Sequence, residues 1–227
     1  MTSLTKNNQW IFKCKRECLA TSLLLFCFFG SNAFSKDLNY KTDGKYRLIA
    51  NQHLINDIDY KKGQGYQILV EIPTGSRQKW EVNHETGHIE WEFRDGKPRE
   101  VKFLGYPGNY GFIPQTLSGD NDPLDIIVLS ESAKRGELLS VKVIGMLKLS
   151  DGGESDNKVI AIRNNGAFNK IGSLSEMLLK KPQVIAIVRN WFEGYKKSGK
   201  MVFLGYEDKD KTIKYIEKAH KNWHSKH

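Results

Sequence analysis

Cysteine is missing from most of the chain. The three cysteines, Cys14, Cys18 and Cys27, all lie within the first 27 residues, so the rest of the chain can form neither a disulfide framework nor a thiolate metal site. The sequence also lacks a P-loop, a glycine-rich dinucleotide fingerprint, internal repeats and low-complexity tracts. A substrate that carries a nucleobase is therefore not required.

Long hydrophobic runs are missing as well. The main apolar run, LATSLLLFCFFG at residues 19–30, is shorter than a membrane-spanning helix, which needs about 20 residues. Basic residues precede it and small residues follow it, which is typical of a secretory signal peptide over residues 1–35; an uncleaved anchor and a misassigned start codon are the alternatives. We expect a periplasmic or secreted protein without stable membrane association after cleavage, or a cytoplasmic one if this segment is not a functional signal.

The composition indicates one folded domain. Hydrophobic residues make up 39% of the 227 residues and aromatic residues 11%, which suits a globular protein with a single core and not a disordered chain. The formal net charge of +9 is consistent with simple solubility or with an anionic partner such as nucleic acid, phosphate or anionic lipid. Charge alone does not decide between them.

A series of short strands is predicted in the middle of the chain. Alternating or short apolar segments predict strands, and ETG and RDGKP predict turns between them. Many short strands with turn residues between them favour a barrel or a sandwich. The preceding residues 36–62 are polar and mixed, and we predict that they are irregular, within an N-terminal arm covering residues 36–66. The predicted strands cover residues 67–73, 79–83, 88–93, 100–106, 125–130, 138–150 and 157–163.

Helical patterns follow the strands. Ser173 and Glu176 have the spacing of a capping box, and Pro182 suits the first turn of a second helix over residues 182–198. A last strand is predicted at 201–207, followed by an amphipathic helix at 208–223. We expect a mainly β fold with flanking helices: a small five-stranded, OB-like barrel with two or more C-terminal helices packed outside it, in a domain covering residues 67–227.

The segment His84-Glu85-Thr86-Gly87-His88 matches the zinc-protease pattern H-E-x-x-H. That pattern binds zinc only on a helix, where residues i and i+4 share one face. Alternating strand sequence flanks the segment here, and a glycine lies inside it. We therefore interpret both histidines as residues of a surface turn.

Two glycine-containing loops carry clustered carboxylates. The first is GDNDPLD at residues 119–125 and the second is DGGESD at residues 151–156. Each loop alone could simply be solvated, but carboxylates held close together repel one another unless cations lie among them. Oxygen-only ligands suit Mg²⁺, Mn²⁺ or Ca²⁺ and not Zn²⁺. The carboxylates are Asp120, Asp122, Asp125, Asp151, Glu154 and Asp156, with Glu71 and Glu81 on predicted strands nearby.

Basic and phenolic side chains accompany these carboxylates. Cationic side chains hold phosphate groups, while metal ions neutralise phosphate oxygens and lower the pKa of a bound water. Together with the carboxylates, these residues form the set that phosphoryl transfer needs. They are Lys79, Arg99, Lys158, Lys196, Tyr106, Tyr110 and Tyr195.

In these features the sequence resembles the Mg²⁺-dependent soluble inorganic pyrophosphatases of family I. The family signature D-x-D-P-x-D stands at residues 120–125, and five further segments stand in the family's order between residues 67 and 220. The resemblance implies hydrolysis of inorganic pyrophosphate to two phosphates by in-line attack of a metal-activated water. The five segments are VEIP with a downstream lysine and glutamate, KPREV, YPGNYGFIPQT, DGGESDNK and WFEGYKK.

The same resemblance implies a role for each site residue. Asp122 would be the general base, and Asp125 would bridge a pair of metal ions. The Mg²⁺ cluster, for which Mn²⁺ or Zn²⁺ could substitute, would be held by Asp120, Asp125, Asp151, Asp156, Glu71 and Glu81. The two phosphates would be bound by Lys79, Arg99, Tyr110, Lys158, Tyr195 and Lys196, with Tyr106 in support.

One position departs from the family pattern. The family usually has an acidic residue directly after the first aspartate of the second loop, where this chain has Gly152; Glu154 stands two residues later. We expect a weaker site for a late metal ion and an intact core pair. Bacterial members of the family are typically hexamers and eukaryotic members dimers, so the resemblance implies a homo-oligomer without deciding between them.

Two other functions compete with this hypothesis. A barrel with basic and aromatic residues could be a non-catalytic module that binds nucleic acid or polyphosphate without needing Mg²⁺. The acidic clusters would repel a phosphate backbone, so nucleic acid is not an expected partner. A related phosphohydrolase acting on nucleotides is the second alternative, and the lack of a base-stacking motif counts weakly against it.

Overall fold

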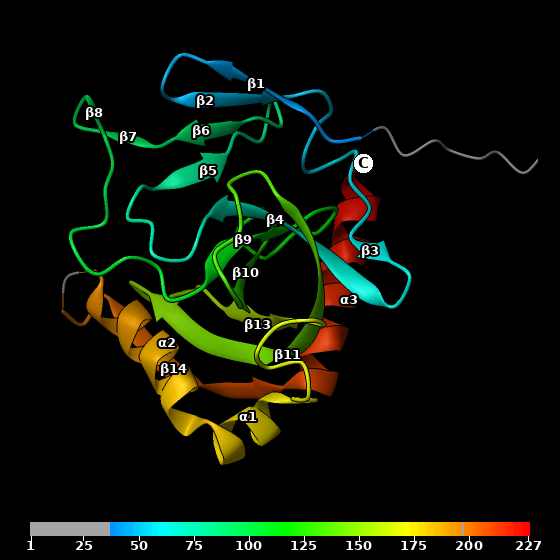
Figure 1. Cartoon of the computed structure of the whole chain (residues 1–227), viewed down its shortest axis with the longest axis vertical. Helices are drawn as coiled ribbons and strands as arrows, with labels where there is room; N and C mark the ends of the chain where they lie inside the picture. Colours follow the sequence, from blue (N-terminus) through cyan, green and yellow to red (C-terminus); the bar gives the residue numbers. More distant parts are fainter. Residues whose placement is uncertain (1–36, 197) are drawn as a thin grey trace, which may run out of the picture. The chain divides into compact units, whose positions relative to one another are not determined.

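A closed ring of five strands forms the centre of the computed structural model of the chain (Figure 1). In ring order, these strands are β4 (Gly65–Ile72), β9 (Asn109–Ile113), β10 (Leu124–Leu129), β13 (Lys158–Arg163) and β11 (Leu138–Asp151), which pairs back onto β4. The β10–β13 pair is parallel and the other four are antiparallel. The predicted five-stranded barrel is confirmed.

The structure describes residues 37–196 and 198–227. The predicted signal peptide at residues 1–35 therefore lies outside the described residues. Within the described ranges, no helix is both long enough and apolar enough to cross a membrane.

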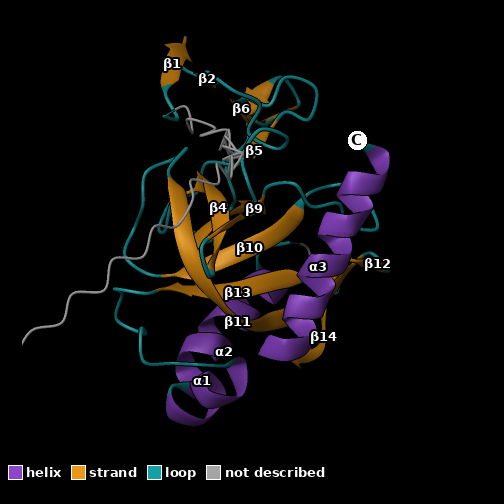
Figure 2. Cartoon of the chain, turned by 90° about the vertical axis from the view of Figure 1, so that its right-hand side faces the viewer, coloured by secondary structure: helices purple, strands orange, loops and turns teal. Residues whose placement is uncertain are grey.

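Three helices pack outside the ring, as the sequence predicts. They are α1 (Leu174–Lys180), α2 (Pro182–Gly194) and α3 (Lys209–Lys226), and β14 (Met201–Asp208) joins the edge of β11 before α3. Figure 2 shows α3 lying alongside the barrel strands and α1 beside α2. Each helix begins near its predicted residue, and α2 ends at Gly194, before the predicted limit of 198.

Local sequence explains where the first two helices begin. The Ser173 hydroxyl accepts the backbone N–H of Glu176 at 3.1 Å, which satisfies a free amide of the first turn. The Glu176 carboxylate accepts the N–H of Gly172 instead of that of Ser173, so only half of the predicted capping box forms. Pro182 occupies the first turn of α2, where its missing N–H costs nothing.

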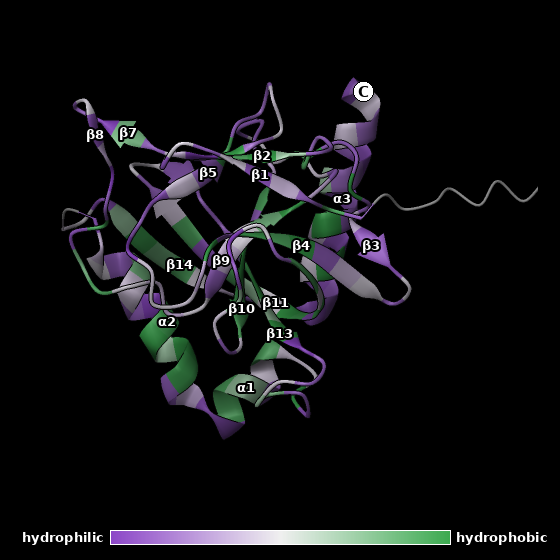
Figure 3. Ribbon diagram, turned by 45° about the horizontal axis from the view of Figure 1, so that its top comes forward, coloured by the Kyte–Doolittle hydropathy of each residue, from purple (hydrophilic) through white to green (hydrophobic). Residues whose placement is uncertain are grey.

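Hydrophobic residues run along much of the ring strands (Figure 3), and β10 is apolar on both faces because both faces are covered. In β10, Ile126 and Val128 belong to a buried cluster that includes Ile216 of α3. The alternate residues Ile127 and Leu129 belong to a second cluster, which includes side chains of α1 and α2. A strand covered on both sides reads as a continuous apolar run and not as an alternating one.

The region predicted to be irregular at residues 36–62 contains regular structure from residue 40 on, so the prediction of irregular structure is wrong. β1 (Tyr40–Asp43) and β2 (Arg47–Ala50) form a hairpin, and β2 pairs with β6 (Ile89–Trp91), which pairs with β5 (Trp80–Val82). The pairing partners of this polar hairpin lie about forty residues downstream, so local pattern does not reveal it.

The predicted strand at residues 100–106 is also wrong. Only an isolated bridge joins Glu100 to Gln78, and the strand lies further on, in β9. The chain bends at residues 102–104, and Gly105 then packs so closely on Gly75 that a Cβ there would lie 2.2 Å from the backbone oxygen of Gly75. The remaining strands are short: β3 (Lys61–Lys62), β7 (Phe93–Arg94), β8 (Lys97–Pro98) and β12 (Glu154–Ser155).

A substitution at Gly111 tests the register between β9 and β4. A Cβ at position 111 would lie 1.8 Å from the backbone oxygen of Leu69, so the strand pairing must shift to accept a side chain. We expect Gly111→Ala to lower the free energy of unfolding by about 2 kcal/mol or more in urea denaturation. Gly119→Ala is the matched control, since a Cβ there meets nothing within 4 Å. Equal stabilities of the two variants would contradict this register.

Candidate active site

One pocket of about 350 Å³ gathers most of the predicted site residues. It lies where β4, β9 and β10 of the ring face the sheet that contains β5. Twelve of the fourteen residues predicted from the sequence line it. They are Glu71, Lys79, Glu81, Arg99, Tyr110, Asp122, Asp125, Asp151, Asp156, Lys158, Tyr195 and Lys196.

The two other predicted residues lie outside the pocket wall. Asp120 lines a neighbouring pocket, and its carboxylate accepts the backbone N–H of Asp122 at 3.0 Å. This bond shapes the acidic loop. Tyr106 is 3% exposed, and its ring centroid lies 5.2 Å from that of Tyr110. Its position under the pocket agrees with a supporting role.

Strand register brings the central charges together. Ile126 of β10 pairs with Val159 of β13 in parallel, so Asp125 and Lys158 are the preceding residues of two neighbouring strands. The Lys158 ammonium bonds to the carboxylates of both Asp125 and Asp156. Its side chain is only 3% exposed. A buried cation between two acids keeps them close at a distance where they would otherwise repel each other.

Two more lysines pair with predicted metal ligands. Lys196 bonds to Asp151, and Lys79 lies 2.6 Å from Glu81. Burial alone would lower the pKa of Lys79, but Tyr106, Glu81 and Glu71 raise it overall. The lysine therefore stays charged and available to a phosphate group.

The carboxylates of the pocket differ in their environments. Glu71 is buried and accepts the N–H of Val82 at 2.7 Å, and burial raises the pKa of Glu71 to about 8 despite the nearby charge of Lys79. Burial also raises the pKa of Asp122, and Asp120 adds to this, while His84 opposes it. A carboxyl group with a raised pKa is a better proton acceptor than an ordinary aspartate.

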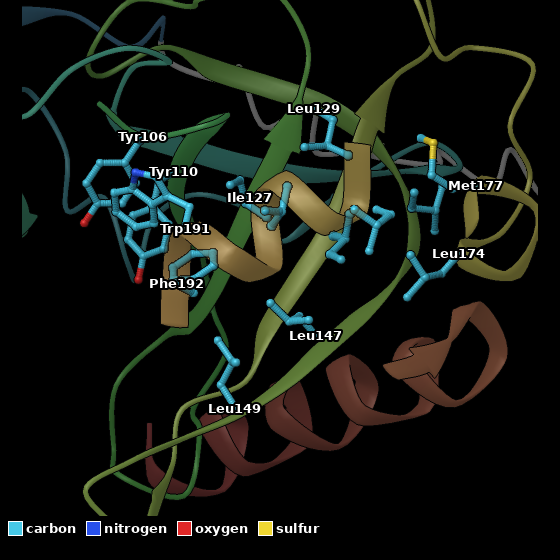
Figure 4. Close-up of a cluster of buried hydrophobic side chains, with 14 of the residues drawn as sticks. Tyr106, Tyr110, Ile127, Leu129, Leu147, Leu149, Leu174, Met177, Trp191 and Phe192 are labelled. Carbon is cyan, nitrogen blue, oxygen red and sulfur yellow. The ribbon is translucent and has the colours of Figure 1, made fainter. Parts of the chain in front are cut away.

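Aromatic rings pack against the two tyrosines that line the pocket, and Figure 4 shows Tyr106, Tyr110, Trp191 and Phe192 grouped together. The centroids of Tyr106 and Trp191 lie 4.3 Å apart, and Trp191 stacks on Tyr195 at 4.7 Å. These contacts fix the rings of Tyr110 and Tyr195. Burial holds the pKa of Tyr110 well above its usual range, so its hydroxyl stays protonated and can donate a hydrogen bond.

His84 is the pocket residue whose role the sequence pattern did not reveal. It lies in the turn between β5 and β6, as predicted for the H-E-x-x-H segment, but it lines the pocket with Nδ1 3.7 Å from Asp122. The Asn83 side chain shapes this turn by accepting the N–H groups of Glu85 and Thr86, each at 3.0 Å. Nothing in the spacing distinguishes His84 from other turn histidines. Val82, Phe112 and Pro123 also line the pocket.

The donor set fits a hard divalent cation. All the acidic side chains of the pocket offer oxygen, the ligand that Mg²⁺ prefers. The Oδ1 atom of Asp151 is buried and has no hydrogen-bond partner; the Lys200 ammonium lies 3.9 Å from it, so its lone pairs can still accept an ion. Over the described part of the chain, no three histidine, cysteine or acidic side chains already form a metal-binding group. Lysine ammonium groups pair with the acids instead.

The turn after Asp151 explains why a glycine stands at position 152. Asp151 pairs with Glu154 across a two-residue turn, in which Gly152 and Gly153 have φ angles of +61° and +98°. Positive φ at both positions favours glycine. Glu154 lines the neighbouring pocket and not the candidate site, so it does not replace the acid that is missing at position 152.

Known sequences match most of this chain. A family model described as inorganic pyrophosphatase matches residues 68–224. The chain is 35% identical over 157 residues to an inorganic pyrophosphatase of Halalkalibacterium halodurans, covering 67% of this chain and 91% of that protein. It is 36% identical over 159 residues to a soluble inorganic pyrophosphatase of Oryza sativa subsp. indica, covering 66% and 70%. The match to the Zea mays soluble inorganic pyrophosphatase spans 59% of that protein's length.

Solved structures share the fold. A type I inorganic pyrophosphatase from Toxoplasma gondii aligns with a TM-score of 0.75 and 25% identity, covering 82% of this chain and 97% of that one. An inorganic pyrophosphatase from Thermus thermophilus aligns with a TM-score of 0.66 and 27% identity, covering 76% and 99%.

The fold and the pocket define a small barrel whose carboxylates and cations suit a multiply charged anion together with metal ions. The chain belongs to the inorganic pyrophosphatase family. This membership supports inorganic diphosphatase as its enzyme class, and family I pyrophosphatases are metal-dependent.

Lys158 gives a test of the charge balance. Replacing it with methionine leaves Asp125 and Asp156 close together without their cation. Since removal of one partner from a buried ion pair is strongly destabilising, we expect Lys158→Met to lower the free energy of unfolding in EDTA by about 2 kcal/mol, discounted for the partial exposure of the two acids. Urea denaturation at pH 7 measures this.

The pH dependence and a control sharpen the same test. Burial would lower the pKa of Lys158, but the two aspartates raise it overall, above the ordinary value near 10.4. Its stabilising contribution is thus complete below that value and lost only as pH rises through the higher folded-state pKa. The loss of unfolding free energy in Lys158→Met should therefore be the same at pH 6 and pH 9. Lys180→Met, which breaks an exposed pair with Glu176, should change little; equal losses in both variants would contradict the buried role of Lys158.

Proposed function

We propose that the protein hydrolyses inorganic pyrophosphate to two phosphates by in-line attack of a metal-activated water. The observation that carries this proposal is the convergence of twelve predicted residues of both charges on one pocket. Membership in the inorganic pyrophosphatase family supports it. The size of the pocket, about 350 Å³, suits a small anion with its ions.

The cationic and phenolic side chains would bind the two phosphates. Lys79 and Lys158 line the site pocket, while Arg99 and Lys196 line both this pocket and the one beside it. Tyr110 and Tyr195, both held by aromatic contacts, would donate hydrogen bonds to phosphate oxygens. Charge-assisted hydrogen bonds of this kind stabilise the charge that develops on the leaving phosphate.

The carboxylates would hold the metal ions and accept the proton. Mg²⁺ is the proposed ion and Mn²⁺ a substitute, bound by the pocket carboxylates of Asp125, Asp151, Asp156, Glu71 and Glu81; Asp120, which lines the neighbouring pocket, would join them. When bound, such ions lower the pKa of a water molecule and neutralise phosphate oxygens. Asp122 would take the proton from that water. Its carboxylate has a raised pKa and faces the pocket beside His84, which suits a general base.

Phosphate release from pyrophosphate tests this function. We expect release that requires Mg²⁺, and a fall of about 100-fold or more in kcat for Asp122→Asn, because loss of a general base typically costs that much. Asp210→Asn is the matched control, since Asp210 is an exposed aspartate of α3 outside the pocket. No release by folded wild-type protein would contradict the function; full activity of Asp122→Asn would contradict only the role of Asp122.

We also propose that the protein acts outside the inner membrane, where it would release usable phosphate. The signal-peptide pattern of residues 1–35 supports this. Amino-terminal sequencing of the protein from separated cell fractions is the test. We expect exported protein that begins near residue 36, whereas cytosolic protein that begins at residue 1 would contradict export.

A further inference from the structure

A second and larger pocket adjoins the candidate active site. Its volume is about 1100 Å³, compared with about 350 Å³ for the site. The two pockets share four lining residues, Arg99, Asp151, Tyr195 and Lys196. We call the second pocket the basic annex. A ligand bound in the site through these shared residues can therefore extend into the annex.

The annex has an excess of positive charge. Seven of its lining residues are cationic and three are acidic. Some of these charges are compensated, as in the pair of Arg77 with Glu100 at 2.8 Å. Lys97 and Lys102 have no ion-pair partner over residues 37–196 and 198–227. The annex should therefore attract a polyanion more strongly than a singly charged ion.

One wall of the annex is a short hairpin that presents two cations. Strands β7 and β8 are joined by Asp95 and Gly96, whose φ angles of +52° and +70° belong to a two-residue turn. Arg94 and Lys97 lie directly opposite each other across the hairpin. Like charges in this position destabilise a strand pair, and Arg94 is partly neutralised by Glu92 at 3.1 Å. A bound polyanion would relieve the remaining repulsion. Figure 1 shows this hairpin at the upper left.

We propose that the basic annex binds the distal phosphates of a linear inorganic polyphosphate whose terminal phosphate occupies the candidate active site. This inference rests on the proposed function for its chemical step. Asp122 and His84 line the active-site pocket but not the annex. Arg99, Tyr195 and Lys196 line both pockets. A water near Asp122 therefore attacks the terminal phosphorus, and the leaving group points toward the annex.

The balanced step is hydrolysis of one phosphoanhydride bond. The water oxygen forms a bond to the terminal phosphorus, and the bond from that phosphorus to the bridging oxygen breaks. The bridging oxygen keeps the electron pair and leaves with the shortened chain, and the water proton passes to the Asp122 carboxylate. Tripolyphosphate would thus give phosphate and pyrophosphate, and pyrophosphate is the substrate of the same site.

The aromatic content of the annex favours an inorganic chain over a nucleotide. Recognition of a nucleobase uses a free aromatic face for stacking. The aromatic lining residue of the annex is Tyr195, and its ring already stacks on Trp191 at 4.7 Å with the planes 10° apart. With one face of its aromatic residue occupied, the annex offers mainly lysine and arginine, which match a chain of phosphates better than a base.

Binding and turnover of tripolyphosphate test the annex directly. We expect the double variant Lys97→Ala/Lys102→Ala to weaken tripolyphosphate binding by about tenfold in titration calorimetry, since each exposed charge contributes modestly. Its pyrophosphate affinity and kcat/KM should stay within about twofold of wild type by the same reasoning, as neither lysine lines the smaller pocket. Lys41→Ala/Lys45→Ala, which removes two exposed lysines of the β1–β2 hairpin, is the charge-matched control.

The outcomes separate this inference from the proposed function. If pyrophosphate is hydrolysed but tripolyphosphate neither binds nor reacts, the annex inference is wrong and the function stands. The annex inference would also be overturned if the Lys97/Lys102 variant lost the same affinity for both ligands. An equal loss of tripolyphosphate affinity in the Lys41/Lys45 control would overturn it too. If tripolyphosphate binding depends on these lysines while neither compound is hydrolysed, the annex stands as a binding site and the catalytic function is wrong.

Discussion

The ion pairing of one buried lysine with two aspartates is the interaction on which the site depends. Asp125 and Asp156 would repel each other without Lys158, whose side chain is 3% exposed. Asp125 and Lys158 meet because β10 and β13 run parallel at this point in an otherwise antiparallel ring. Ring closure between β11 and β4 holds these strands in place. The topology of the barrel is therefore what allows opposite charges to be buried together.

Lysine pairing and metal binding are two ways to satisfy the same carboxylates. In the structure, Lys158, Lys196 and Lys79 neutralise acids of the pocket. In the proposed reaction, metal ions would neutralise them, and the same lysines would be free to bind phosphate. In the absence of metal ions, the lysines would keep the acids of such a site close together. When metal ions bind the acids, the lysines would be released to bind phosphate. The aromatic rings beneath it limit how far the side chains can move.

The sequence predicted the parts of the protein that local pattern determines. The ring strands β4, β10 and β13 are short apolar runs and β11 is a longer, largely apolar one, and the carboxylates and cations of the site stand in clear motifs. Non-local contacts explain the failures. The β1–β2 hairpin needs β6 as a partner, and the chain at Gly105 packs against the backbone of the distant Gly75. His84 enters the pocket through the shape of a turn, and Asp120 faces the neighbouring pocket, neither of which residue spacing reveals.

The location of bound metal ions provides the most direct test. Mn²⁺ resembles Mg²⁺ in its preference for oxygen ligands and scatters anomalously, so a crystal structure of the protein with Mn²⁺ and pyrophosphate would place both. We predict Mn²⁺ among Asp125, Asp151 and Asp156, with Lys158 shifted from the acids to a phosphate oxygen. Mn²⁺ found only outside this pocket, or pyrophosphate bound elsewhere while Lys158 stays between its two aspartates, would contradict the proposed mechanism.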